Sequence, residues 1–134
     1  MLLDQALLDN VSAEAKESPR LRMNFNLHES LDSKVQRLFN AMEPGTIVPI
    51  QRHQNTAETM LLVRGKMTVY FHNQVGDITE TFVLPPKDGV YGVHIPKGQW
   101  HSVEVLESGT VMFEVKEGPY APLSNEDIIN IERK

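Results

Sequence analysis

The sequence predicts an all-β fold, a barrel or sandwich of short strands with one short N-terminal helix. From Gly45 onward, runs rich in β-branched and aromatic residues are separated by glycine or proline about every eight to twelve residues, a spacing typical of sandwiches and barrels. In two of these runs, 66–71 and 110–115, side chains alternate as they do in strands. An apolar stripe over residues 3–17 predicts the helix.

The N-terminal helix is marked by apolar residues three or four positions apart. The stripe consists of Leu3, Ala6, Leu7, Val11 and Ala15. Ser18 and Pro19 end it, because the residue before a proline disfavours the helical conformation. A helix of this length is marginal in isolation. We therefore expect its leucine face to pack on the barrel or on a second subunit.

The strands are expected between the glycine and proline turns. Residues 35–42 fit either period and are assigned to a strand from their context. The other expected extended runs are 20–27, 59–63, 67–71, 78–84, 90–95, 100–105 and 110–115. All of them need partners, and a closed or doubled sheet removes exposed edges. Near the C-terminus, Ser124 and Asp127 have the spacing of a capping box, which predicts a brief helix.

Length and composition predict a single globular domain. The 134 residues divide into a helical segment 1–19, a barrel 20–122 and a tail 123–134. A formal charge of -5 without a basic cluster argues against a nucleic-acid partner. No apolar run approaches the ~20 residues that span a bilayer, so we expect no membrane contact and a cytoplasmic location. The chain lacks cysteine, so a metal would need nitrogen and oxygen ligands.

Two segments concentrate metal-binding side chains beside turns. Segment 45–65 contains His53 and Glu58, and segment 96–101 ends on His101. In both, an imidazole or carboxylate lies next to a β-rich run, where a rigid scaffold can direct it inward. Two imidazoles and one carboxylate form the facial arrangement of non-haem Fe(II) sites, and nickel, manganese or zinc take the same donors.

The same two segments resemble the two motifs of the cupin superfamily. Segment 45–65 matches the spacing of the first motif, and the Pro96 to His101 segment matches the second. The resemblance implies a small cupin-type jelly-roll β-barrel with one divalent transition metal ion (Fe, Ni, Mn or Zn). The implied ligands are His53, Glu58 and His101. Gln51 stands where the family has its first histidine, and it is a fourth ligand, a hydrogen-bond donor near the metal, or neither.

A narrower resemblance extends over much of the chain. Segments 24–28, 35–38, 43–46 and 113–120 look like the WbuC family, small cupin-fold metalloproteins often encoded among O-antigen and surface-polysaccharide genes. This resemblance implies a saccharide as the small-molecule ligand and a role in polysaccharide biosynthesis.

The leading functional hypothesis is a metal-dependent enzyme acting on a small polar metabolite such as a sugar derivative. Arg20, Arg22 or Arg52 would pair with an anionic group on that substrate. Two alternatives remain open: a non-catalytic saccharide- or metal-binding accessory protein, and a metal-free sugar-nucleotide isomerase or epimerase with histidine as the base. Sheet edges and the leucine-rich helix favour a homodimer.

The remaining histidines have weaker assignments. His28 follows an extended run and is expected in a solvated turn, with contact to the metal as the alternative. His72 ends a strand and is expected to face solvent, whereas the face of His94 is open. Three methionines on strands are expected to fill the core. They are Met60, Met67 and Met112.

Overall fold

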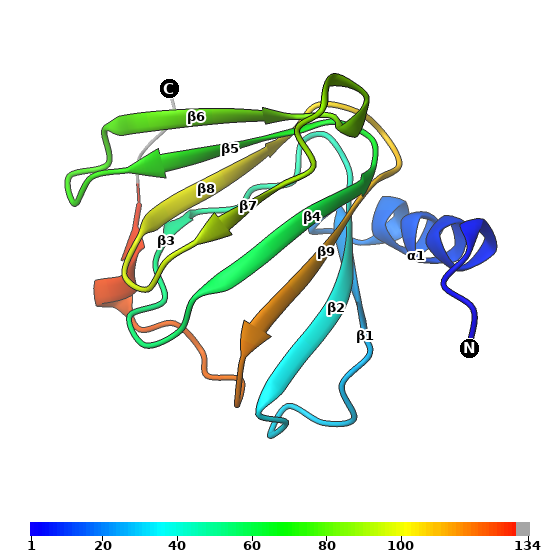
Figure 1. Ribbon diagram of the computed structural model, residues 1–134, viewed down its shortest axis with the longest axis horizontal. Helices are drawn as coiled ribbons and strands as arrows, with labels where there is room; N and C mark the ends of the chain where they lie inside the picture. Colours follow the sequence, from blue (N-terminus) through cyan, green and yellow to red (C-terminus); the bar gives the residue numbers. More distant parts are fainter. Residues whose placement is uncertain (131–134) are drawn as a thin grey trace.

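The computed structural model describes residues 1–130, which form two five-stranded antiparallel sheets with one helix on the outside (Figure 1). Sheet A has the strand order β1-β2-β9-β4-β7, and sheet B the order β10-β3-β8-β5-β6. The elements are α1 (Gln5–Glu17), β1 (Arg22–Asn26), β2 (Val35–Met42), β3 (Ile50–Gln51), β4 (Glu58–Arg64), β5 (Met67–His72), β6 (Ile78–Leu84), η1 (Pro86–Asp88), β7 (Gly92–Ile95), β8 (Trp100–Val105), β9 (Thr110–Glu117), η2 (Asn125–Asp127) and β10 (Ile128–Ile129). The predicted jelly-roll fold class is confirmed. The strands form two separate sheets that face each other.

The core lies between the two sheets. It is a cluster of buried side chains from both, namely Met42, Met60, Leu62, Met67, Val69, Phe71, Leu84, Val93, Ile95, Val103, Val105 and Met112. Full burial of one such side chain stabilises the fold by roughly 1.5–3 kcal/mol. The three methionines expected in the core are confirmed there.

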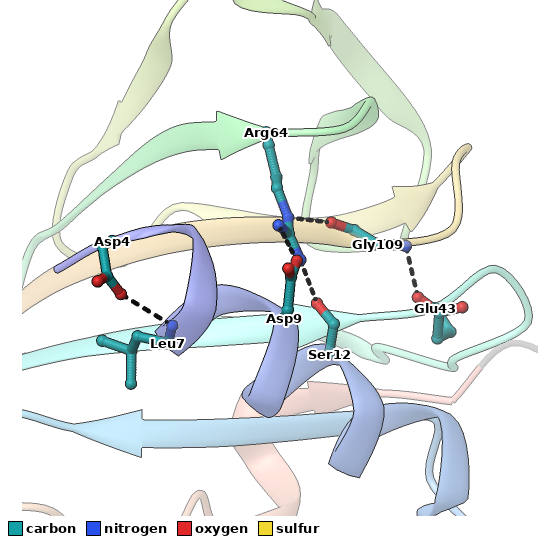
Figure 2. Close-up of polar contacts among 7 residues, drawn as sticks. All are labelled: Asp4, Leu7, Asp9, Ser12, Glu43, Arg64 and Gly109. Carbon is teal, nitrogen blue, oxygen red and sulfur yellow. Dashed lines mark hydrogen bonds and ion pairs between the residues drawn. The ribbon is translucent and has the colours of Figure 1, made fainter.

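Helix α1 covers the outer face of sheet A (Figure 1). It begins after Asp4, whose carboxylate accepts a hydrogen bond of 3.0 Å from the amide of Leu7, as an N-cap does (Figure 2). Its apolar face packs on the sheet, the first of the two expected surfaces. This second cluster consists of Leu8, Val11 and Ala15 from the helix with Phe39, Ala41 and Val111 from the sheet.

A polar bridge fastens the same helix to the strands (Figure 2). The guanidinium of Arg64, at the end of β4, donates to Asp9 at 2.6 Å and to Ser12 at 3.0 Å in the helix. Its Nε donates to the carbonyl of Gly109 at 2.9 Å, and the amide of Gly109 donates to the buried Glu43 at 2.6 Å. The helix is therefore bound to the turn before β9 by hydrogen bonds as well as by apolar contacts.

The turn between β4 and β5 requires a glycine. Gly65 has φ +92°, a conformation that other residues rarely adopt. A side chain at this position would also overlap the backbone of Thr110. The last glycine of the first motif is thus explained by a close approach of two chain segments.

The brief C-terminal helix that was predicted is present as a single 3-10 turn after Ser124, but the predicted side-chain capping bond is missing within residues 1–130. Residues 125–127 form this turn, and the hydroxyl of Ser124 donates to the carboxylate of Asp127 at 3.1 Å and not to the backbone. The chain then adds β10 to the edge of sheet B, where it pairs with β3. Of the helices described, none is long and apolar enough to cross a membrane.

Candidate metal centre

Three segments bring two imidazoles and a carboxylate together between the sheets. Glu58 is the first residue of β4 in sheet A, His101 lies on β8 in sheet B, and His53 lies in the loop after β3. The carbonyl of His53 accepts a hydrogen bond of 2.8 Å from the amide of Gly98, which fixes this loop to the turn before β8. The candidate ligand atoms of the three residues lie within 4.8 Å of one another.

The carboxylate of Glu58 lies between the two rings. Its Oε1 is 2.9 Å from His101 Nε2 and 3.9 Å from His53 Nε2. The side chains of Glu58 and His101 are almost completely buried, at 4% and 1% exposure. His53 is partly open to the cavity, so the cluster has a closed side and an open side.

These contacts shift the protonation of all three groups. Burial alone would lower the pKa of His101, but the close carboxylate of Glu58 outweighs it and raises that pKa. Burial would raise the pKa of Glu58, yet the two neighbouring imidazoles lower it. The pKa of His53 is lowered, because burial there dominates over the attraction of Glu58. The cluster therefore favours a charged carboxylate facing one neutral imidazole.

The donor atoms are those that a divalent metal needs. Glu58 Oε1 and His101 Nε2 are buried and, apart from their contact with each other at 2.9 Å, neither has a hydrogen-bond partner among the residues described. Buried polar atoms without partners are rare in folded proteins. The other ring nitrogen of His101 donates to the carbonyl of Gln99 at 2.9 Å, an arrangement that directs the Nε2 lone pair toward the cluster.

Gln51 lies beside this cluster. It is the register partner of His101 in the β3–β8 pair, and directly opposed residues project to the same face of a sheet. Both residues line the same cavity. Its amide is therefore next to the cluster and available to a metal or to a bound molecule.

The cluster opens into a cavity of about 410 Å³ between the sheets. This volume is within the range of about 300–1,000 Å³ that is usual for small-molecule sites. Polar side chains make up much of its wall outside the cluster: Arg20, Arg22, Asn24, Asn40, Gln51, Glu114 and Lys116. The cavity therefore suits a polar molecule.

Glu114 is a buried carboxyl in this cavity that the sequence analysis missed. It lies on β9 opposite Met60 of β4. Burial, with the charge of Glu58 as a second cause, raises the pKa of Glu114 to about 7. A signal was present, because alternation along 110–115 puts Glu114 on the same face as Met112, which was expected in the core.

Two histidine predictions were wrong. His28 is buried and accepts a hydrogen bond of 3.2 Å from the amide of Arg37, away from the cavity lining. His72 is also buried, with its ring nitrogens bonded to Ser102 at 2.8 Å and to the carbonyl of Gly76 at 3.0 Å. In both cases a hydrogen-bonded turn or neighbouring strand covers the ring, which the local pattern does not reveal.

The three arginines considered for anion binding have different positions. Arg20 and Arg22 line the cavity. Arg52 instead forms an ion pair of 3.0 Å with Asp127 and lies 4.6 Å from the centre of the Trp100 ring. Arg20 and Arg22 therefore stay candidates for binding an anionic group in the cavity, whereas Arg52 is already paired with a carboxylate.

A family model matches residues 3–84 of the chain, and that family is described as a Domain of unknown function (DUF6016). No curated protein matches the chain. The WbuC resemblance therefore stays a prediction.

Several hundred solved chains match the fold. KdgF from Halomonas sp. shares 14% identity with a TM-score of 0.60, over 78% of this chain and 84% of that one. A cupin 2 domain-containing protein from Halorhodospira halophila shares 16% with a TM-score of 0.56, over 78% and 72%. The capsular polysaccharide assembling protein CapF from Staphylococcus aureus shares 24% with a TM-score of 0.57, over 75% of this chain and 26% of that protein. The chain thus has the fold of cupin domains and belongs to the family described as a Domain of unknown function (DUF6016).

Proposed function

We propose that this protein binds one divalent transition metal through His53, Glu58 and His101 and uses it to act on a small polar metabolite such as a sugar derivative. The observation that carries the proposal is the convergence of three metal-binding atoms within 4.8 Å at the wall of a cavity of metabolite size. Iron, nickel, manganese and zinc all accept two imidazoles and one carboxylate. A metal in this site would polarise a carbonyl or hydroxyl oxygen as a Lewis acid.

The protein's own residues would hold and orient the substrate. The amides of Asn24, Asn40 and Gln51 line the cavity and offer both donors and acceptors to hydroxyl groups. Glu114 lines the same wall, and its raised pKa of about 7 lets it give or take a proton near neutral pH. This set supports a polyhydroxylated substrate over an apolar one.

A role in surface-polysaccharide metabolism is the more specific part of the proposal. It is supported by the resemblance of several segments to the WbuC family and by the likeness of the fold to part of CapF, described as a capsular polysaccharide assembling protein.

Elemental analysis of protein purified without added metal tests the metal site. We expect close to one transition metal ion per chain, with most of it lost in His53→Ala and in His101→Ala. His94→Ala is the matched control, because that ring is exposed, is hydrogen-bonded to Thr59 and does not line the cavity. Full occupancy in both site variants, with folding checked by circular dichroism, would overturn the assignment.

A metal-free acid–base enzyme is the second candidate, favoured by the close approach of His101 to Glu58 at 2.9 Å. Such a pair can exchange a proton with a substrate without a metal. Turnover of a panel of sugar derivatives, measured before and after thorough chelation, separates the two candidates. Activity that survives chelation favours the acid–base pair, whereas tight binding without turnover favours an accessory protein.

A further inference from the structure

Two cationic side chains line the cavity and form no ion pair with the residues that the structure describes. Arg20 and Arg22 flank Leu21 immediately before and at the start of β1, the edge strand of sheet A, and both line the cavity. Leu21 has φ 56°, and it is the one residue other than glycine with a positive φ within residues 1–130. Its amide donates to Ser18 and its carbonyl accepts from the amide of Glu43, each at 2.9 Å. The backbone that presents both arginines is therefore held in an unfavourable conformation by hydrogen bonds.

The contrast with other arginines is direct. Arg52 and Arg64 form ion pairs with Asp127 and Asp9, at 3.0 Å and 2.6 Å. Within the described part of the chain, Arg20 and Arg22 form none, although Arg22 is partly buried. The Nε of Arg22 is buried from solvent and has no hydrogen-bond partner there. A buried guanidinium donor without an acceptor is costly unless a ligand supplies one.

The two carboxyl groups of the cavity do not neutralise this pair. Glu58 lies against His101 on β4, three strands away from β1 in sheet A. Glu114 lies on β9, and its pKa of about 7 keeps much of it uncharged at neutral pH. Burial and the neighbouring charge of Arg20 lower the pKa of Arg22, and together they outweigh the attraction of Glu114, which acts in the opposite direction.

We infer that Arg20 and Arg22 form a subsite for the anionic group, a carboxylate or a phosphate, of an organic substrate whose other end reaches the His53, Glu58 and His101 cluster. Arg22 is the register partner of Met42, and Glu114 is the register partner of Met60. Both methionines are in the core, so Arg22 and Glu114 lie on the same inner face of sheet A. Three strand spacings of about 4.8 Å lie between β1 and β4, and along the strands Arg22 is level with Thr110 of β9 whereas Glu58 is level with Lys116, so the two ends of the substrate would lie diagonally across this wall. The inference deepens the proposed function, since it specifies an acidic sugar or a sugar phosphate.

Titration of metal-free protein with inorganic phosphate, methyl phosphate and acetate tests the subsite by calorimetry. Metal is removed first so that it cannot bind the anions itself. We expect one of these anions to bind the wild type and to bind Arg20→Gln and Arg22→Gln about 10-fold or more weakly, the size of a lost charge-assisted contact. Stronger binding of the phosphates assigns a phosphoryl group, and stronger binding of acetate assigns a carboxylate.

Arg37→Gln is the matched control, because Arg37 is exposed on β2 and does not line the cavity. Arg22→Lys keeps the charge and is expected to retain part of the affinity, which separates loss of the subsite from misfolding. Equal binding by the wild type and both glutamine variants, or no binding of any of the three anions, would overturn the inference. Metal analysis of the protein before chelation keeps the two proposals distinct. Arginine-dependent anion binding by a protein that holds no metal would contradict the metal site alone. A metal in the site without arginine-dependent anion binding would contradict the subsite alone.

Discussion

The carboxylate of Glu58 lies 2.9 Å from Nε2 of His101, with both side chains buried in a cavity wall formed by opposite sheets. Glu58 is the group that raises the pKa of His101 against the effect of burial. We therefore expect Glu58→Gln to lower the pKa of His101 in metal-free protein, because burial then acts without the nearby charge. The same variant should bind a divalent metal at least about 10-fold more weakly.

Histidine NMR signals followed against pH measure the first effect, and competition with a chromophoric chelator measures the second. Glu104→Gln is the control, since Glu104 is exposed on the same strand, β8, outside the cavity lining. An unchanged His101 titration in Glu58→Gln would show that the carboxylate does not act on this ring.

Glu114 predicts a pH-dependent loss of stability. Its pKa is about 7 in the folded protein against an ordinary value of 4.5, so the folded state holds a proton that the unfolded state has released between these values. The free energy of unfolding of metal-free protein should therefore fall as pH rises through this interval. Glu114→Gln stays neutral, and its stability relative to the wild type should increase by up to roughly 3 kcal/mol between pH 4.5 and 7.

Urea unfolding at several pH values, with chelator present, checks this expectation. Glu80→Gln on β6 removes one negative charge from an exposed position and serves as the control. A relative stability of Glu114→Gln that stays constant with pH, or that changes equally in both variants, contradicts the assignment.

Helix α1 offers a matched pair of substitutions. Ala15 is fully buried against sheet A, whereas Ala13 in the same helix is exposed. Ala15→Leu should destabilise the protein by about 1–3 kcal/mol through overpacking. Ala13→Leu should change the stability by no more than about 0.5 kcal/mol. Thermal or urea unfolding measures the stability of both variants. Because each replaces alanine by leucine within the same helix, the change in helix propensity is the same in both. Equal stabilities would mean that the helix does not pack on the sheet in solution.

The elements that the sequence predicted well are those with a strong local pattern. Helix α1 was predicted from its apolar stripe, and most strands lie within a few residues of the predicted runs, because alternation and glycine or proline turns are local properties. The convergence of His53, Glu58 and His101 was anticipated from a resemblance and not from spacing alone, since β4 and β8 belong to different sheets.

The features that were missed depend on tertiary contacts. Alternation along 110–115 puts Glu114 on the face of Met112, but this strand is covered on both faces, and the burial of a carboxyl there depends on the opposite sheet, which the local pattern does not show. His72 is buried by partners thirty and four positions away, Ser102 and Gly76. Likewise, β10 forms because the edge of β3 is free to pair with it. The sequence of the short tail has no strand pattern of its own that would predict this pairing.

Gln51 provides the most direct test of how open the metal centre is. It faces the cavity beside His101, at the position where cupins have another histidine. Gln51→His would replace a weak neutral donor by an imidazole, which zinc and nickel bind more strongly. We expect the affinity for either metal to rise by about 10-fold or more.

The same substitution should alter any catalysis, because a fourth firm ligand takes the position that water or substrate would use at an open metal site. We therefore expect turnover to fall while metal affinity rises. Competition titration against a chromophoric chelator at one pH measures the affinity, and Gln74→His, in an exposed turn outside the cavity lining, controls for an added surface histidine. Equal affinities for the wild type and Gln51→His, with equal numbers of histidine ligands by spectroscopy, would show that residue 51 does not reach the metal, and the fourth position would then have to be filled from elsewhere in the cavity wall.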